Sequence, residues 1–184
     1  MGRLFFITGG VRCGKSSYAE KLASELKTSN EILIYLACGV CTDREMEKRI
    51  LKHRLDRQSS HEKWTTIERP LAIGDIVDTI PSNSIVLLDC LTTLLTNELF
   101  NGDMEGGRYV EDSIYESVIQ LADRVKALLV VSNELFHDIP PETDEILQFQ
   151  RTLGRLHRRL VEKSSIAIDM TVGIPVMKNG VSMK

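Results

Sequence analysis

Residues 7–16 read ITGGVRCGKS, directly after the apolar run LFF. The apolar run predicts a buried strand over residues 3–8, and an apolar stripe predicts a helix over residues 15–27. The segment between them has the spacing G-x-x-x-x-G-K-[ST] of a phosphate-binding loop, in the strand–loop–helix context that this motif requires. The alternative is a glycine-rich turn that happens to precede Lys-Ser.

The motif assigns a role to each part of the loop. Backbone N–H groups curl around a β-phosphate, and the helix N-terminus adds its partial positive charge. Lys15 should bridge the β- and γ-phosphates, and Ser16 should ligate Mg²⁺. The side chains of Arg12 and Cys13 receive no chemistry of their own. The predicted nucleotide-binding loop comprises Gly9, Gly10, Val11, Arg12, Cys13, Gly14, Lys15 and Ser16.

Strands and helices alternate along the rest of the chain. The predicted strands are 3–8, 32–37, 64–67, 84–89, 128–132, 166–172 and 174–177, and the predicted helices are 15–27, 42–57, 70–79, 91–100, 110–126 and 144–163. Continuous apolar strands separated by helices indicate a mostly parallel sheet that is covered on both faces. We therefore predict one α/β domain over residues 1–184, with an antiparallel strand closing the sheet at the C-terminus.

Polar residues end two of the buried strands. Asp89 ends SIVLLD and is predicted to position Mg²⁺ beside the loop, with capping of the following helix as an alternative. Asn133 and Glu134 end the strand at 128–132, where ligand crevices open in α/β sheets. They could ligate Mg²⁺, orient a substrate hydroxyl or touch a nucleoside, or they could cap a helix or turn.

His53 has two arginines as helical neighbours. In the predicted helix 42–57, Arg49 lies one turn before His53 and Arg57 one turn after it. Nearby cations favour the neutral imidazole, which is the nucleophilic form, and they could also hold phosphates. From the residues alone, the alternative is a histidine among surface arginines. The remaining histidines, His61, His137 and His157, have no comparable setting.

The composition excludes several classes of protein. The 184 residues are 42% apolar and 27% charged with a formal net charge of −3, which is typical of a soluble globular domain and not of a nucleic-acid binder. The apolar runs are too short to span a membrane and no signal peptide is visible, so we expect a cytoplasmic protein. Cys38 and Cys41 form a lone CxxC, which lacks the second pair of a zinc site. Four arginines, Arg151, Arg155, Arg158 and Arg159, predict a solvated helix face.

Several segments together resemble the bifunctional adenosylcobinamide kinase / adenosylcobinamide-phosphate guanylyltransferase family of cobalamin assembly. They are ITGGVRCGKSSYAE, DREMEKRILKHR, WTTIE, LLDCLTTLLTNELF, VVSNE, LGRLHRRL and GIPVMK, and they follow the family's order over nearly the whole chain. The phosphate loop is generic. The EM-RI-H segment and the DCLT–TN pair are much more specific.

The resemblance implies two reactions on one RecA-like sheet. The first phosphorylates the aminopropanol hydroxyl of adenosylcobinamide with ATP or GTP, and the second transfers GMP from GTP to that phosphate through a GMP–histidine intermediate. The family histidine falls on His53, and we place Arg49, Arg57, Glu68 and Asp89 with the nucleotide-binding residues. Related members assemble as homotrimers.

The chain departs from the family pattern in places. RQSSHEKW lacks the usual Arg-Pro after the family histidine, LFHDIPP lacks the glycines common after Asn-Glu, and His157-Arg158 replaces the commoner Asn-Gln. These changes could alter corrinoid contacts or the balance of activities. Two alternatives are a P-loop kinase for another small alcohol, and a nucleotide-driven switch or ATPase without a covalent intermediate.

Overall fold

The computed structural model describes residues 2–39, 62–101, 107–135 and 143–180. The elements are β1 (Arg3–Gly9), α1 (Lys15–Leu26), β2 (Ile32–Ala37), β3 (Trp64–Glu68), η1 (Ile73–Thr79), β4 (Ser84–Asp89), α3 (Leu91–Phe100), α4 (Gly107–Arg124), β5 (Ala127–Asn133), α5 (Asp144–Lys163), β6 (Ile166–Asp169) and β7 (Val176–Gly180). The strands form one sheet in the order β3-β2-β4-β5-β1-β6-β7. Neighbouring strands are parallel except β6 and β7, which confirms the predicted architecture.

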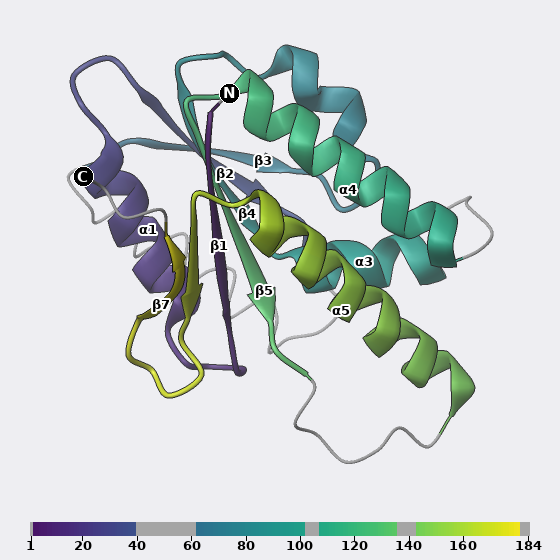
Figure 1. Cartoon of the computed structure of the whole chain (residues 1–184). Coiled ribbons are helices and arrows are strands. Elements are labelled where there is room, and N and C mark those ends of the chain that lie inside the picture. The colour runs from purple at the N-terminus through teal and green to yellow at the C-terminus, as the bar shows by residue number, and fades with distance from the viewer. Residues whose placement is uncertain (1, 40–61, 102–106, 136–142, 181–184) are drawn as a thin grey trace, which may run out of the picture.

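Helices cover both faces of the sheet (Figure 1). Successive side chains of a strand point to opposite faces, so β1 sends Leu4 and Phe6 into one apolar layer and Phe5 and Ile7 into the other. The first layer is closed by η1, α3, α4 and α5, and the second by α1. Within the described residues, no helix is both long and apolar enough to cross a membrane.

Several predicted elements differ from the structure in type or in bounds. The strand predicted over residues 174–177 is β7 at Val176–Gly180, and the helix predicted over residues 110–126 is α4 at Gly107–Arg124. The segment predicted as a helix over residues 70–79 is the 3₁₀ helix η1, whose sequence IGDIVDT contains a glycine and several β-branched residues that disfavour a regular α-helix. The strand predicted over residues 166–172 ends at Asp169, because Asp169 Oδ1 accepts the backbone N–H of Thr171 at 2.9 Å and begins a turn. Gly173 completes that turn with a φ of +75°. The predicted helix 42–57 lies outside the described residues.

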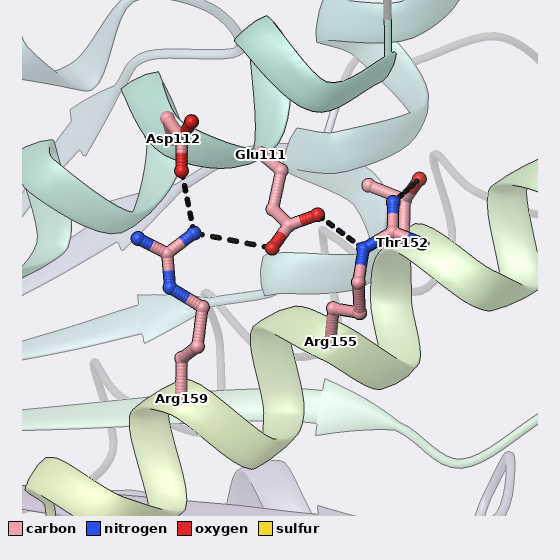
Figure 2. A network of polar contacts seen from close by, with 5 residues as sticks. All are labelled: Glu111, Asp112, Thr152, Arg155 and Arg159. Carbon is pink, nitrogen blue, oxygen red and sulfur yellow. Dashed lines mark hydrogen bonds and ion pairs between the residues drawn. The ribbon is translucent and has the colours of Figure 1, made fainter.

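An ion-pair network joins α4 to α5 (Figure 2). The Glu111 side chain is 6% exposed and accepts hydrogen bonds from Arg155 Nε at 2.6 Å and Arg159 Nη1 at 3.1 Å. Arg159 also donates to Asp112 Oδ1 at 2.7 Å, and its guanidinium lies 3.8 Å from the ring centroid of Tyr115. The Arg155 and Arg159 side chains stay 43% and 29% exposed, as a solvated face predicts in part, but both also join α5 to α4, which the sequence did not predict.

We predict that Glu111→Ala destabilises the fold more than Asp112→Asn does. Loss of Glu111 leaves two partly buried guanidiniums without their shared carboxylate, at a cost of about 1–3 kcal/mol. Asp112 is 54% exposed, so its single bond should contribute less than about 1 kcal/mol. Urea unfolding of both variants measures the difference, and equal stabilities would contradict the role of Glu111 in joining α4 to α5.

Candidate active site

The phosphate loop leaves β1 at Gly9 and enters α1 at Lys15, as the motif predicts. At two positions of the loop the structure explains why the residue is glycine. A Cβ atom on Gly9 would lie 2.8 Å from Cys13 Sγ and 2.9 Å from the backbone of Met170. Gly14 has a φ of +89°, and Arg12 has a φ of +62°, which is uncommon for a residue with a side chain. The loop is therefore tightly wound, and Gly9 has no space for a side chain.

Lys15 is held inside this loop. Its side chain is mostly buried, with the residue 7% exposed, and its Nζ donates to the carbonyl oxygen of Gly10 at 2.9 Å. The first backbone bond of α1 runs from Tyr18 N to Gly14 O. The ammonium thus sits over the loop at a helix N-terminus, where both the lysine charge and the helix dipole favour an anion. Ser16 follows in the first turn and is partly buried.

The carboxyl ends of the parallel strands meet at the edge that carries the loop. Gly9 pairs with Asn133 of β5, and β5 in turn pairs with β4, which ends at Asp89. Asp89, predicted to position Mg²⁺ beside the loop, is not on a strand adjacent to β1, because β5 lies between β1 and β4. At about 4.8 Å per strand, the β1 and β4 backbones are about 10 Å apart, which is space for phosphates and an ion rather than for a direct contact.

Asp89 is oriented by a tyrosine from the next strand. Tyr35 of β2 is buried, and its hydroxyl donates to Asp89 Oδ2 at 2.7 Å. In the part of the chain that the structure describes, Oδ1 of Asp89 has no hydrogen-bond partner. The N-cap of α3 is Cys90, so the capping alternative for Asp89 is not what the structure shows. Sequence reasoning missed Tyr35, although it is the one polar-tipped side chain in the strand ILIYLA.

Asn133 and Glu134 connect the end of β5 to its surroundings through their backbone. Asn133 N donates to Thr92 Oγ1 of α3 at 2.8 Å, and Glu134 N donates to Gly9 O at 2.9 Å. The helix that follows β5 in the described residues has Thr143 as its N-cap, so neither residue caps it. The side chain of Asn133 reaches toward the start of α3, where its Nδ2 lies 4.0 Å from Cys90 Sγ.

Residues 96–99 of α3, TNEL, stabilise the loops at the carboxyl ends of β2 and β3. Asn97 is buried and its Nδ2 donates to Cys38 O at 2.9 Å and Pro70 O at 3.1 Å. Glu98 is also buried, and its Oε1 accepts the N–H of Ala72 at 2.7 Å. These side chains satisfy backbone groups of the segments that follow β2 and β3, because buried N–H and C=O groups need partners. The segment therefore fixes the loops around the carboxyl edge.

Glu68 lies on the same edge but far from the phosphate loop. It ends β3 and pairs with Ala37, which pairs in turn with Asp89. Four strand spacings, about 19 Å, separate the β3 and β1 backbones. The assignment of Glu68 to the nucleotide site stays a prediction. The predicted His53, Arg49 and Arg57 lie outside the described residues.

The buried thiols near the edge are poor nucleophiles. Burial raises the pKa of Cys38 well above its ordinary value, and burial with the neighbouring Asp89 charge raises the pKa of Cys90. Cys41, the second cysteine of the CxxC, lies outside the described residues.

Among the described residues there is no group of three or more His, Cys, Asp or Glu placed to hold a metal ion. A magnesium ion on phosphates needs only one or two protein ligands, and Ser16 and Asp89 carry the hard oxygen donors that it prefers.

Comparison with solved structures finds the same fold at low identity. The flagellar accessory protein FlaH from Methanocaldococcus jannaschii has a TM-score of 0.52 at 13% identity, and the match covers 91% of this chain and 70% of that one. The KaiC-like protein PH0186 from Pyrococcus horikoshii OT3 has a TM-score of 0.53 at 9% identity, with the same coverage of 91% and 70%. At such low identity, these likenesses support the RecA-like sheet alone.

Sequence comparison is more specific. The bifunctional adenosylcobalamin biosynthesis protein CobU of Escherichia coli K12 is 33% identical over 94% of this chain and 98% of its own length. CobP of Pseudomonas aeruginosa, a protein of the same description, is 31% identical over 95% and 96%. The family model described as cobinamide kinase / cobinamide phosphate guanyltransferase matches residues 5–178, from the core of β1 into β7. That match contains the phosphate loop, the strand β4 that ends at Asp89, and the helix α5. The chain therefore belongs to the cobinamide kinase / cobinamide phosphate guanyltransferase family.

Proposed function

We propose that this protein phosphorylates adenosylcobinamide and then transfers GMP from GTP to the new phosphate, giving adenosyl-GDP-cobinamide. The observation that carries the proposal is the buried Lys15 over a tightly wound phosphate loop, in a chain whose family match runs over residues 5–178. The relatives from Escherichia coli and Pseudomonas aeruginosa are named as bifunctional adenosylcobalamin biosynthesis proteins, which supports both activities on one chain.

The kinase step uses the edge formed by β1, β5 and β4. The loop N–H groups and Lys15 would hold the β- and γ-phosphates of ATP or GTP, while the hydroxyl of the corrinoid side chain attacks the γ-phosphorus. Negative charge spreads over the phosphoryl oxygens as the bond to the leaving nucleoside diphosphate breaks, and the proton of the hydroxyl is released to solvent. Lys15 is placed to stabilise that charge, because it is already fixed over the loop by Gly10 O.

Ser16 and Asp89 are the residues that would hold Mg²⁺. The hydroxyl and the carboxylate are hard oxygen ligands, and Tyr35 fixes one carboxylate oxygen while the other has no hydrogen-bond partner among the described residues. When bound, the ion would neutralise phosphate charge during phosphoryl transfer. Asn133 ends β5, which lies between β1 with its phosphate loop and β4 with Asp89, and it could orient the substrate hydroxyl.

The guanylyl step requires a nucleophile, and we propose His53. A neutral ring nitrogen attacks the α-phosphorus of GTP, forming a P–N bond as the bond to pyrophosphate breaks, and the corrinoid phosphate then takes the GMP. Arg49 and Arg57 would favour the neutral ring and offset phosphate charge. This assignment is supported by the EM-RI-H segment and by the family match that contains it.

The proposal also covers the assembly and the cellular location of the protein. We propose a homotrimer on the resemblance alone. A cytoplasmic location fits an enzyme that consumes nucleoside triphosphates, and the net charge of −3 does not suit a nucleic-acid partner. Glu68 is about 19 Å from β1 along the sheet, so as a nucleotide-binding residue it would contact the nucleoside rather than the phosphates held by the loop.

We predict that Lys15→Ala reduces kinase turnover by about 10²–10³-fold, because the ammonium stabilises charge that develops in the transition state. Lys21→Ala is the matched control, since Lys21 lies on the same helix with its side chain 76% exposed. Steady-state kinetics with adenosylcobinamide and ATP measure both. Wild-type turnover in a folded Lys15→Ala protein would refute the loop assignment.

We predict that both reactions stop in EDTA and that Asp89→Asn raises the Mg²⁺ concentration needed for half-maximal kinase rate. Tyr35→Phe keeps the carboxylate charge and removes only its hydrogen bond, so its effect should be smaller. A magnesium titration of the three proteins makes the comparison. Full activity in EDTA, or an unchanged titration for Asp89→Asn, would count against this ion site.

We predict that α-³²P-GTP labels the wild-type protein and that His53→Ala abolishes the label while it retains the kinase step. The label should survive base and be lost in acid, as expected for a P–N bond. His61→Ala is the control and should label normally. Label on His53→Ala, or on Lys, would disprove the proposed nucleophile. A wild type that binds GTP but never becomes labelled would be a kinase alone.

A further inference from the structure

A chain of polar side chains, buried at Ser132 and Thr92 and partly buried at His157, runs from α5 to the edge that carries the phosphate loop. His157 Nε2 lies 2.7 Å from Ser132 Oγ, and Ser132 Oγ lies 3.0 Å from Thr92 Oγ1. Thr92 Oγ1 accepts the backbone N–H of Asn133 at 2.8 Å. Ser132 is fully buried and Thr92 is 7% exposed, so bulk water does not replace these bonds. None of these contacts was expected from sequence, where His157 had no distinctive setting.

The chain of bonds ends at the proposed site. Asn133 pairs with Gly9, the first residue of the loop, and the next residue donates its N–H to Gly9 O. Thr92 lies in the first turn of α3, three residues after Asp89. One hydrogen-bonded series therefore links the end of β5, the start of α3 after Asp89, and a histidine on α5 that lies outside the site.

The directions of these bonds depend on the state of His157. The N–H of Asn133 can only donate, so Thr92 uses its oxygen to accept and has one proton to give. If Thr92 donates to Ser132, then Ser132 donates to Nε2, and every bond in the series points the same way. That order requires a neutral ring with an unprotonated Nε2. Burial lowers the pKa of His157 to about 4, and the ring of Phe6 packs edge-on at 5.0 Å, which fixes its plane.

We propose that His157 is a positioning residue for phosphoryl transfer, because it orients the hydroxyls of Ser132 and Thr92 and so holds Asn133 and the start of α3 against the phosphate loop. In this role His157 acts through Ser132 and Thr92 and not by contact with the reacting atoms. The inference rests on the proposed kinase activity. It differs from a purely structural role, which would change the stability of the fold but not the turnover of the folded enzyme.

The test compares His157→Phe, which keeps a ring against Phe6 but has no acceptor, with His157→Gln, whose terminal amide can reach the Nε2 position. In folded protein at pH 7, kinase kcat of His157→Phe should fall roughly tenfold or more while the nucleotide KM changes less than about threefold, because misplaced groups affect the transition state most. His157→Gln should recover most of the rate. Ser132→Ala should lower kcat similarly, and the Ser132→Ala/His157→Phe double variant should be no worse than the poorer single variant.

Circular dichroism and urea unfolding show which variants are folded at assay temperature. Should His157→Phe fail to fold, Ser132→Ala and His157→Gln carry the comparison. Unchanged kcat in folded His157→Phe or Ser132→Ala, or effects that multiply in the double variant, would overturn the positioning role and leave the proposed function standing. A wild-type protein without kinase activity would overturn both.

Discussion

The parallel pairing of β1 between β5 and β6 is the constraint on which the site depends. This register sets Gly9 opposite Asn133 and brings the carboxyl ends of β1, β5, β4 and β2 to one edge. The phosphate loop can leave β1 only at that edge, and Met170 after β6 crowds it so closely that Gly9 cannot carry a side chain. The loop and the polar ends of its neighbours are thereby placed together before any ligand binds.

Polar contacts then convert this edge into a preorganised surface. Lys15 is fixed by Gly10 O, Asp89 by Tyr35, and the end of β5 by Thr92, so each group comes from a different element but has one orientation. Buried polar groups of this kind are costly unless every partner is present, which ties the edge to the correct packing of α3 and α5. Phosphoryl transfer gains most from groups that do not have to reorganise as charge develops.

The sequence predicted the parts of the fold where local and tertiary preferences agree. The bounds of β4, α3 and α5 match the predicted ones, because a continuous apolar run or a clear apolar stripe decides them. It could not predict that β5 separates β1 from β4, since strand order depends on how crossovers pack. It also overextended the strand at 166–172, where the side chain of Asp169 starts a turn. Tyr35 and His157 were missed because their roles depend on partners 54 and 25 residues away in sequence.

The central claim is that Lys15 and the carboxyl edge form one nucleotide site, and a crystal structure with Mg²⁺ and a non-hydrolysable GTP analogue tests it most directly. The account predicts that Lys15 Nζ leaves Gly10 O for a phosphate oxygen, with the β-phosphate inside the loop and the ion between Ser16 and Asp89. A nucleotide bound elsewhere, with the 2.9 Å bond from Lys15 to Gly10 intact, would contradict it.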